Sequence, residues 1–275
     1  MLTSISLGPF ALMTSTALLF ASILLFWFLV SFFTKSSEYQ KIATDTVFFC
    51  LVSGFVVARV TFVITMWEIY QKDWIAAFDI RDGGFNHYLG WFTGIMLLVF
   101  KTRRQHKVAS VYFKSAVITG LVIFPLFVVN TLMKQQIAFN DIEVANAKGE
   151  SQSLSLQTGK PLIINFWASW CPPCRREMPI LESAQQQYKN VTFIFVNQGE
   201  APTQAHQFLE VNSIELDNAY FDFTGKTAKE LGAYGLPTTL FFNSEGKLID
   251  SHMGELSEAS LQHYMQPLID DSNQI

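Results

Sequence analysis

Residues 162–178 read LIINFWASWCPPCRREM, and this stretch decides the fold of the second half of the chain. A mostly apolar run with high β propensity leads into Trp-Ala-Ser-Trp, and Cys171 and Cys174 then open a segment with helical periodicity. We therefore expect the two cysteines at the point where a strand is followed by the N-terminus of a helix.

This position predicts a reactive thiol pair. A helix N-terminus carries roughly half a positive charge, and thiols in Cys-x-x-Cys motifs titrate at about 3.5 to 7.5 instead of about 8.5. We expect Cys171 to be the nucleophile and Cys174, one helical turn later, to resolve the mixed disulfide. The alternatives are a purely structural disulfide and half of a zinc site. Zinc usually takes four ligands, and no second Cys-x-x-Cys or paired histidine follows, so redox catalysis without a metal or cofactor is favoured.

Four motifs carry a family resemblance: NFWASWCPPCRREMP, VNQGE at 196–200, GLPTT at 235–239 and FFNSEGK at 241–247. Through them the chain, from about residue 139 to residue 275, resembles the thioredoxin superfamily, specifically its TlpA-like and ResA-like membrane-anchored thiol-disulfide oxidoreductases. The resemblance implies an α/β thioredoxin-like domain, which we expect over residues 134–275. It also implies a protein-disulfide reductase whose partners are protein disulfides or thiols, such as apocytochromes in cytochrome c biogenesis.

Pro237 stands where thioredoxin-like folds hold a cis-proline against the dithiol, so the resemblance implies a cis peptide bond there. The alternative is an ordinary trans-proline at the start of a strand. A proline has no N–H, which leaves the backbone of Leu236 free to pair with an extended substrate. Thr238 and Trp170 are expected to complete this substrate site, although Trp170 can equally fill the core. For Trp167 the core is the favoured interpretation.

Glu200 follows the expected strand at residues 191–196 and matches the position of an acid near the active site of ResA-like proteins. A carboxylate beside the dithiol can relay the proton of Cys174. Thioredoxins proper place an aspartate on the strand before the motif, where this chain has Asn165, which cannot titrate. Glu200 is therefore the only candidate for that task, and the alternative is a solvated loop acid.

Residues 1–133 have a different composition. Residues 7–33 contain no charge over 27 positions, which exceeds both the 18 or so that identify a membrane span and the apolar region of a cleaved signal peptide. Further apolar stretches cover residues 46–67, 85–100 and 108–133, and only Arg59 and Lys114 interrupt them. We expect an α-helical membrane domain of about four spans in the lipid bilayer.

The positive charges predict the orientation. Cationic loops face the cytoplasm, so both termini are expected outside it and the thioredoxin-like domain in the periplasm, where disulfides are exchanged. The chain is thus expected to be a multi-pass protein of the bacterial inner membrane. The cations lie between the first and second stretches (Lys35, Lys41) and between the third and fourth (Lys101, Arg103, Arg104, Lys107).

The membrane half carries a second resemblance. Ala58-Arg59 and DGGFNHYLG at residues 82–90 resemble fragments of prolipoprotein diacylglyceryl transferase, whose Gly-Gly-x-x-x-His-Gly-Gly run is matched with His87 one position early. This resemblance implies an alternative function, a lipid-handling membrane enzyme with an accessory redox domain. An intramembrane arginine needs a partner, which for Arg59 is either a structural pairing or a lipid headgroup. His87 is either an interfacial residue or a catalytic base.

The remaining cysteine and the charge limit the possible partners. Cys50 lies in the second apolar stretch, where a single cysteine usually behaves as a small hydrophobic residue. Carrying electrons across the bilayer by dithiol exchange needs at least two membrane cysteines, so we expect an upstream membrane electron donor. A net charge of −4 without a basic stretch in residues 134–275 argues against nucleic-acid binding.

Overall fold

The structure is a computed structural model that describes residues 4–7, 10–35, 37–103, 106–135, 142–154 and 159–272. The described chain divides into two compact units. One unit is helical and consists of Ser15–Ile80 and Gly84–Val129, and the other contains the remaining described residues. Each unit is described by itself.

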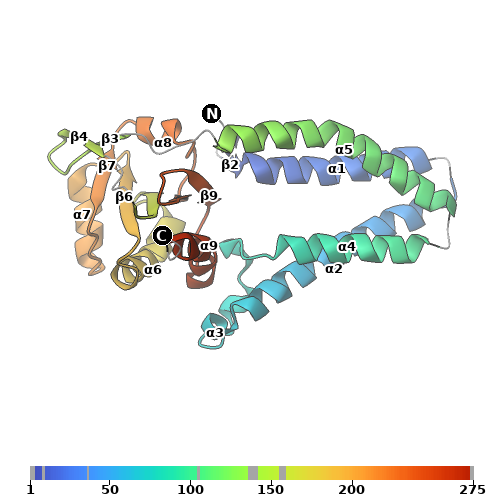
Figure 1. Ribbon diagram of the computed structural model, residues 1–275, viewed down its shortest axis with the longest axis horizontal. Helices are drawn as coiled ribbons and strands as arrows, with labels where there is room; N and C mark the ends of the chain where they lie inside the picture. Colours follow the sequence, from blue (N-terminus) through green and yellow to red (C-terminus); the bar gives the residue numbers. More distant parts are fainter. Residues whose placement is uncertain are drawn as a thin grey trace. The chain divides into compact units, whose positions relative to one another are not determined.

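The helical unit is built from long apolar helices joined by short segments (Figure 1). A short antiparallel hairpin of β1 (Ser4–Leu7) and β2 (Phe10–Met13) precedes it, so the first apolar helix begins at Thr14 and not at residue 7 as expected. The helices are α1 (Thr14–Thr34), α2 (Gln40–Thr65), α3 (Trp67–Tyr70), α4 (His87–Thr102) and α5 (His106–Gln135), with the 3₁₀ turns η1 (Ala76–Phe78) and η2 (Ile80–Asp82) between α3 and α4.

Three of these helices, α1, α2 and α5, are long and apolar enough to cross a membrane. Helix α4 has 16 residues, and at 1.5 Å per residue it is about 24 Å long, which is shorter than the hydrocarbon core of about 30 Å. The expected α-helical membrane domain is thus confirmed, with three full-length candidate spans and one shorter apolar helix. The chain is a membrane-anchored protein.

Helices α2 and α4 pack closely because glycines face each other. A Cβ atom added to Gly54 would lie 2.7 Å from the carbonyl oxygen of Gly90, and one added to Gly90 would lie 2.8 Å from Cβ of Ala58. Gly54 and Ala58 are one helical turn apart on α2. Small residues at this spacing let two helix backbones approach in a membrane, where apolar burial alone does not drive helix association.

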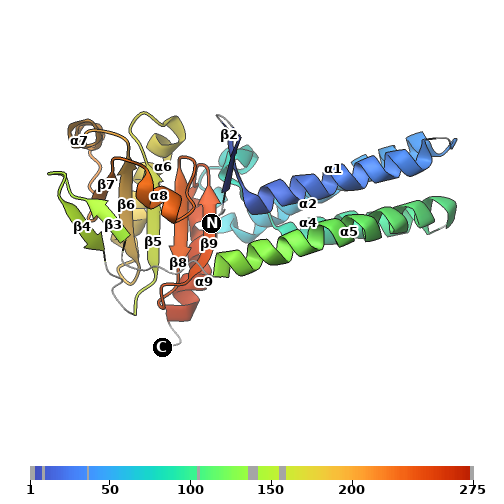
Figure 2. The same cartoon turned by 90° about the horizontal axis from the view of Figure 1, so that it is seen from above.

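The second unit is a seven-stranded sheet with the order β4-β3-β7-β6-β5-β8-β9, which Figure 2 shows strand by strand. Strands β5, β6 and β7 are parallel, and β8 and β9 continue the sheet in antiparallel pairing. This is the α/β thioredoxin-like architecture that the sequence predicted. The strands are β3 (Ile142–Ala145), β4 (Ser151–Leu154), β5 (Leu162–Trp167), β6 (Thr192–Gln198), β7 (Ala219–Asp222), β8 (Thr238–Phe242) and β9 (Leu248–Met253).

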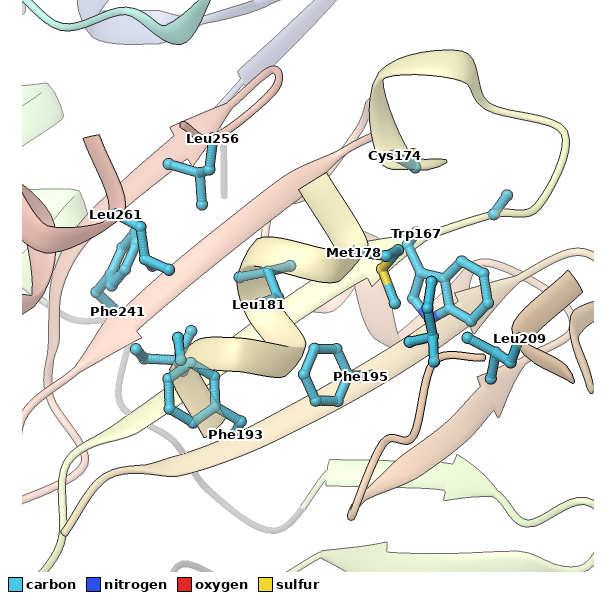
Figure 3. Packing of buried hydrophobic residues seen from close by; sticks show 14 of the residues in the cluster. Trp167, Cys174, Met178, Leu181, Phe193, Phe195, Leu209, Phe241, Leu256 and Leu261 are labelled. Atoms are coloured by element: carbon cyan, nitrogen blue, oxygen red, sulfur yellow. The ribbon is translucent and has the colours of Figure 1, made fainter. Parts of the chain in front are cut away.

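Both faces of the sheet are buried, and the alternation along β5 decides which side chain faces which layer. Ile163 and Trp167 contribute to the core formed with α6 (Pro172–Gln187), α7 (Pro202–Val211) and α9 (Glu258–Ser272). Figure 3 shows Met178 and Leu181 of α6 in this core. Ile164 and Phe166 face the other core, which includes residues of α8 (Lys226–Glu230). Because side chains alternate along a strand, Asn165 faces the α6 side.

Candidate active site

Cys171 and Cys174 form a disulfide with a Cα–Cα distance of 5.3 Å. Strand β5 ends at Trp167, and Cys171 is the N-cap residue of α6, so the pair lies at the strand-to-helix junction that the sequence predicted. The N–H of Cys174 donates to Sγ of Cys171 over 3.3 Å. A backbone donor and the helix N-terminus both favour negative charge on this sulfur once the disulfide is reduced. Cys174 is fully buried and Cys171 is 3% exposed, so Cys171 is the sulfur closer to solvent.

The peptide bond between Leu236 and Pro237 is cis, which confirms the prediction for this loop. Pro237 directly precedes β8, which pairs antiparallel with β5 so that Thr238 lies opposite Phe166. This register places Pro237 beside the end of β5 from which the dithiol loop leaves. Thr238 is buried, and its hydroxyl donates to the carbonyl of Gly235 over 2.6 Å, so the hydroxyl is used within the loop.

The two tryptophans of the motif have opposite environments. Trp167 is buried in the α6-side core, where its ring centroid lies 5.8 Å from that of Phe208. Trp170 is 65% exposed and directly precedes Cys171. Trp167 is therefore a core residue, and Trp170 presents an aromatic surface next to the disulfide.

Glu200 is a buried residue with three donors on its carboxylate. The N–H and the hydroxyl of Ser169 donate to it over 2.8 and 2.5 Å, and Nδ2 of Asn197 donates over 2.6 Å. Because β5 and β6 are parallel, Ser169 and Glu200 leave the sheet at the same edge. Only 6% of Glu200 is exposed, which excludes the solvated loop acid. Through these hydrogen bonds Glu200 fixes the position of Ser169, which lies two residues before Cys171 in the chain.

Glu177 is a second buried acid, which the sequence reasoning missed. Its Oε1 accepts from Nδ2 of Asn165 over 2.8 Å, and its Oε2 accepts from the N–H of Leu256 over 2.9 Å. Burial raises the pKa of Glu177 to about 8, although these two hydrogen bonds act to lower it. Glu177 is therefore a second candidate acid beside Glu200, and it is bound to Asn165, the residue at the position of the thioredoxin aspartate. The signal in the sequence is that Glu177 lies three residues after Cys174, a spacing that places both side chains on one face of the helix.

The loop after β9 connects the helix that carries the thiols to the cis-proline. Arg176 makes a bidentate ion pair with Glu255, in which Nε donates to Oε1 over 3.0 Å and Nη2 donates to Oε2 over 2.6 Å. The neighbouring Leu256 is bound by Glu177, and the N–H of Gly254 donates to the carbonyl of Pro237 over 3.0 Å. Adjacent residues of one loop thus hold both α6 and the cis-proline segment.

In the helical unit, Arg59 pairs with backbone groups. Its Nε donates to the carbonyl of Ala77, its Nη1 to Gly84 and its Nη2 to Asp79, over 3.0, 2.8 and 2.7 Å. This is the structural pairing that the sequence left open. His87 is exposed at the first position of α4, whose N-cap is Asn86. Cys50 is a buried free thiol. Within the described parts of the chain, no group of three His, Cys, Asp or Glu side chains could hold a metal ion.

Comparisons with known proteins match each half of the chain separately. The family model described as Redoxin matches residues 134–265, and the model of prolipoprotein diacylglyceryl transferase matches residues 2–128. Both resemblances inferred from the sequence are therefore confirmed. Among solved structures, StoA from Bacillus subtilis covers 46% of this chain and 97% of its own, with a TM-score of 0.40 and 23% identity.

Curated relatives identify the redox half. Thiol-disulfide oxidoreductase ResA from Halalkalibacterium halodurans is 32% identical over 124 residues, which are 43% of this chain and 68% of the relative. ResA from Bacillus subtilis is 29% identical over 122 residues, which are 44% of this chain and 68% of the relative. Together with the disulfide at the start of α6, this similarity makes the protein a redox enzyme. The chain belongs to the family of thiol-disulfide oxidoreductases that includes ResA.

Proposed function

We propose that this protein is a membrane-anchored protein-disulfide reductase that works in the periplasm through Cys171 and Cys174. The observation that carries the proposal is the disulfide of Cys171 and Cys174 at the N-terminus of α6. The loop that contains Pro237 lies at the adjoining end of β5. In this assignment Cys171 and Cys174 exchange disulfides and Pro237 shapes the substrate site. Glu200 serves proton transfer.

The proposed cycle balances two electrons and two protons. In the reduced enzyme the Cys171 thiolate attacks a client disulfide, one client sulfur leaves as a thiol, and a mixed disulfide forms. Cys174 then attacks Cys171, which releases the second client thiol and closes the Cys171–Cys174 disulfide present in the structure. Two thiols of an upstream membrane donor reduce this disulfide again, and the donor is oxidised to a disulfide.

Cys174 is fully buried, so its proton needs an acceptor before it can attack. Glu177 lies three residues later on the same helix, and its pKa of about 8 is close to that of an ordinary thiol. A proton passes most readily between groups of similar pKa, so the ionised form of Glu177, which becomes abundant as the pH approaches 8, is the proposed acceptor. Glu200 holds Ser169 of the dithiol loop in place and is the second proposed relay.

The client is proposed to bind as an extended segment along Leu236, with its side chains against Trp170. Two observations support this. Leu236 lies two residues before β8, whose start pairs with the end of β5, and Trp170 exposes its ring directly before Cys171. Thr238 contributes by fixing the loop through Gly235. The proposed clients are disulfides of apocytochromes or of the cysteines of metal sites, which the protein reduces.

The proposed organisation is a membrane domain over residues 1–133 and a periplasmic redox domain over residues 134–275, in the bacterial inner membrane. The cations between α4 and α5 support cytoplasmic placement of that loop. Reporter fusions within residues 101–107 should therefore be active in the cytoplasm, and fusions after residue 134 should be active in the periplasm. A cytoplasmic reporter signal after residue 134 would exclude the proposed compartment.

The lipid-handling enzyme remains the second candidate function, because the diacylglyceryl transferase model matches residues 2–128. Full-length protein in nanodiscs separates the two. The pre-reduced wild type should reduce a disulfide-bonded client peptide stoichiometrically, and Cys171→Ala should abolish this reduction. If client reduction is absent while diacylglyceryl transfer from phosphatidylglycerol to a lipoprotein-signal peptide proceeds equally in both proteins, the second candidate is correct.

A further inference from the structure

The segment from residue 67 to residue 80, between α2 and α4, exposes large apolar side chains although it is not a membrane span. Phe78 is 77% exposed and Trp74 is 67% exposed, and their ring centroids lie 6.4 Å apart in an edge-on arrangement. Trp67, Ile75 and Ile80 are also more than half exposed. Exposed apolar groups gathered in one short segment mark an interaction surface.

Backbone carbonyl groups of the same segment bind an arginine of α2. The carbonyl oxygens of Ala76, Ala77 and Asp79 accept hydrogen bonds from Arg59 of α2, over 3.4, 3.0 and 2.7 Å. The guanidinium carbon of Arg59 lies 5.6 to 5.8 Å from the ring centroids of three aromatic residues, Phe62, Tyr70 and Phe85. The buried guanidinium group of Arg59 thus binds the backbone carbonyls of the segment. The large apolar side chains of the segment are exposed.

The neighbouring helices indicate what covers this surface. At the end of α2, Val60 and Ile64 are more than half exposed, and at the start of α4, Trp91 and Phe92 are exposed as well. Helix α2 is a candidate membrane span and α4 is a shorter apolar helix, so we expect their exposed apolar side chains to meet lipid. Residues 67–80 connect these two helices in the chain, directly after α2. Aromatic side chains concentrate at the level of the lipid headgroups, where a ring can be buried while polar neighbours stay hydrated.

We propose that residues 67–80 form an interfacial anchor that lies in the headgroup region of the phospholipid bilayer, with Trp74 and Phe78 inserted. Arg59 is the pin of this anchor, by which we mean that its hydrogen bonds hold the segment in position. Glu68, Lys72 and Asp73, all exposed in the same segment, supply the hydrated side. In this arrangement Arg59 binds its own chain and not a lipid headgroup. The proposal does not depend on the redox function of the other unit.

A fluorescent label at Phe78 tests the proposal in the full-length chain. Phe78→Cys is made with Cys50→Ala, and Cys171 and Cys174 stay closed as the disulfide, so the new thiol is the reactive one. The protein is labelled with a nitrobenzoxadiazole dye and placed in liposomes of phosphatidylethanolamine and phosphatidylglycerol. The matched control carries Lys148→Cys in the exposed turn between β3 and β4.

We expect lipid carrying a nitroxide at acyl carbon 5 to quench the label at position 78 several-fold more strongly than the label at position 148, and aqueous iodide to show the reverse order. Equal iodide quenching at both positions would show a segment in water and overturn the proposal. Protection from both quenchers would mean a protein partner or a second copy on this surface, and would overturn it as well. Trp74→Cys, labelled in the same way, repeats the measurement if the Phe78 variant does not fold.

Arg59→Gln tests the pin. Without the guanidinium, the carbonyls of Ala77 and Asp79 lose their donor, so the label at position 78 should gain iodide quenching several-fold while the circular dichroism of the helices is kept. Unchanged lipid quenching in Arg59→Gln would show that the segment holds its position without Arg59. If exchanging phosphatidylglycerol for phosphatidylcholine moves the label in the wild-type background, Arg59 is a headgroup ligand and its role as a pin is refuted.

Discussion

At the scale of single residues, Glu177 combines a charge-bearing group with complete burial. Its carboxyl group is enclosed among Asn165, Leu256 and the α6-side core, and burial raises its pKa from 4.5 to about 8. A folded-state pKa above the unfolded value means that folding favours the protonated form. The contribution to stability is therefore fully present below about pH 4.5 and is lost as the pH rises towards about 8.

Glu177→Gln removes this titration while keeping the size of the side chain. The free energy of unfolding of residues 134–275, measured in urea, should fall for the wild type between about pH 4.5 and pH 8, by at most about 1.4 kcal/mol per pH unit, and should stay flatter for the variant. Glu210→Gln, an exposed position on α7, is the control and should keep the wild-type slope. Identical slopes for the wild type and Glu177→Gln would show that Glu177 is already ionised in the folded protein.

Glu200 differs from Glu177 because three donors surround its carboxylate. A glutamine has one acceptor oxygen, and its amide nitrogen would face another donor, so Glu200→Gln should slow client reduction by about 10²-fold or more if proton transfer is also lost. Ser169→Ala is the matched variant, since it removes one hydrogen bond and keeps the carboxylate.

The pH profile of client reduction distinguishes the two roles of Glu200. A proton relay changes the profile in Glu200→Gln and not in Ser169→Ala. If both variants slow the reaction without a change in profile, Glu200 only positions the dithiol loop. Wild-type rate and profile in Glu200→Gln would remove Glu200 from the mechanism.

At the scale of elements, the contact between α2 and α4 depends on the absence of side chains at its centre. A Cβ on Gly90 would lie 2.8 Å from Cβ of Ala58 and 2.9 Å from the carbonyl oxygen of Gly54, so even alanine must push the helices apart. Gly90→Ala should therefore lower the thermal unfolding midpoint of the full-length protein in micelles, despite the better helix propensity of alanine.

Gly120→Ala on α5 is the control for Gly90→Ala. No atom lies within 4 Å of a Cβ added there, so this variant should unfold at or above the wild-type midpoint. Equal midpoints for Gly90→Ala and Gly120→Ala would contradict the close approach of α2 and α4.

At the scale of the whole molecule, the sequence predicted what local patterns encode. The helix start at Cys171, the cis bond before Pro237 and the two family resemblances follow from short motifs, and all are found. Contacts between residues that lie far apart in the sequence were not predicted. That Asn165 meets Glu177 depends on packing of α6 over β5, because both residues are polar and neither resembles a core position in the sequence.

The membrane half shows the same division. Apolar length predicted the long helices, but it placed the start of the first one at residue 7, where the structure has a β-hairpin whose second strand is Phe10–Met13. Strand pairing depends on a partner segment, which hydropathy does not report. The partners of Arg59 were also left open, since they are backbone carbonyls from residues 17 to 25 positions away, and no residue type marks them.

The central claim is that Cys171 is the attacking thiol of a protein-disulfide reductase, and trapping the mixed disulfide tests it most directly. Full-length Cys174→Ala, reduced and in a Cys50→Ala background, should form a one-to-one adduct with a disulfide-bonded client peptide, visible by mass spectrometry and released by dithiothreitol. Cys171→Ala in the same background should form none, because Cys174 is fully buried. Equal adducts from both variants, or an adduct from Cys171→Ala alone, would contradict the account.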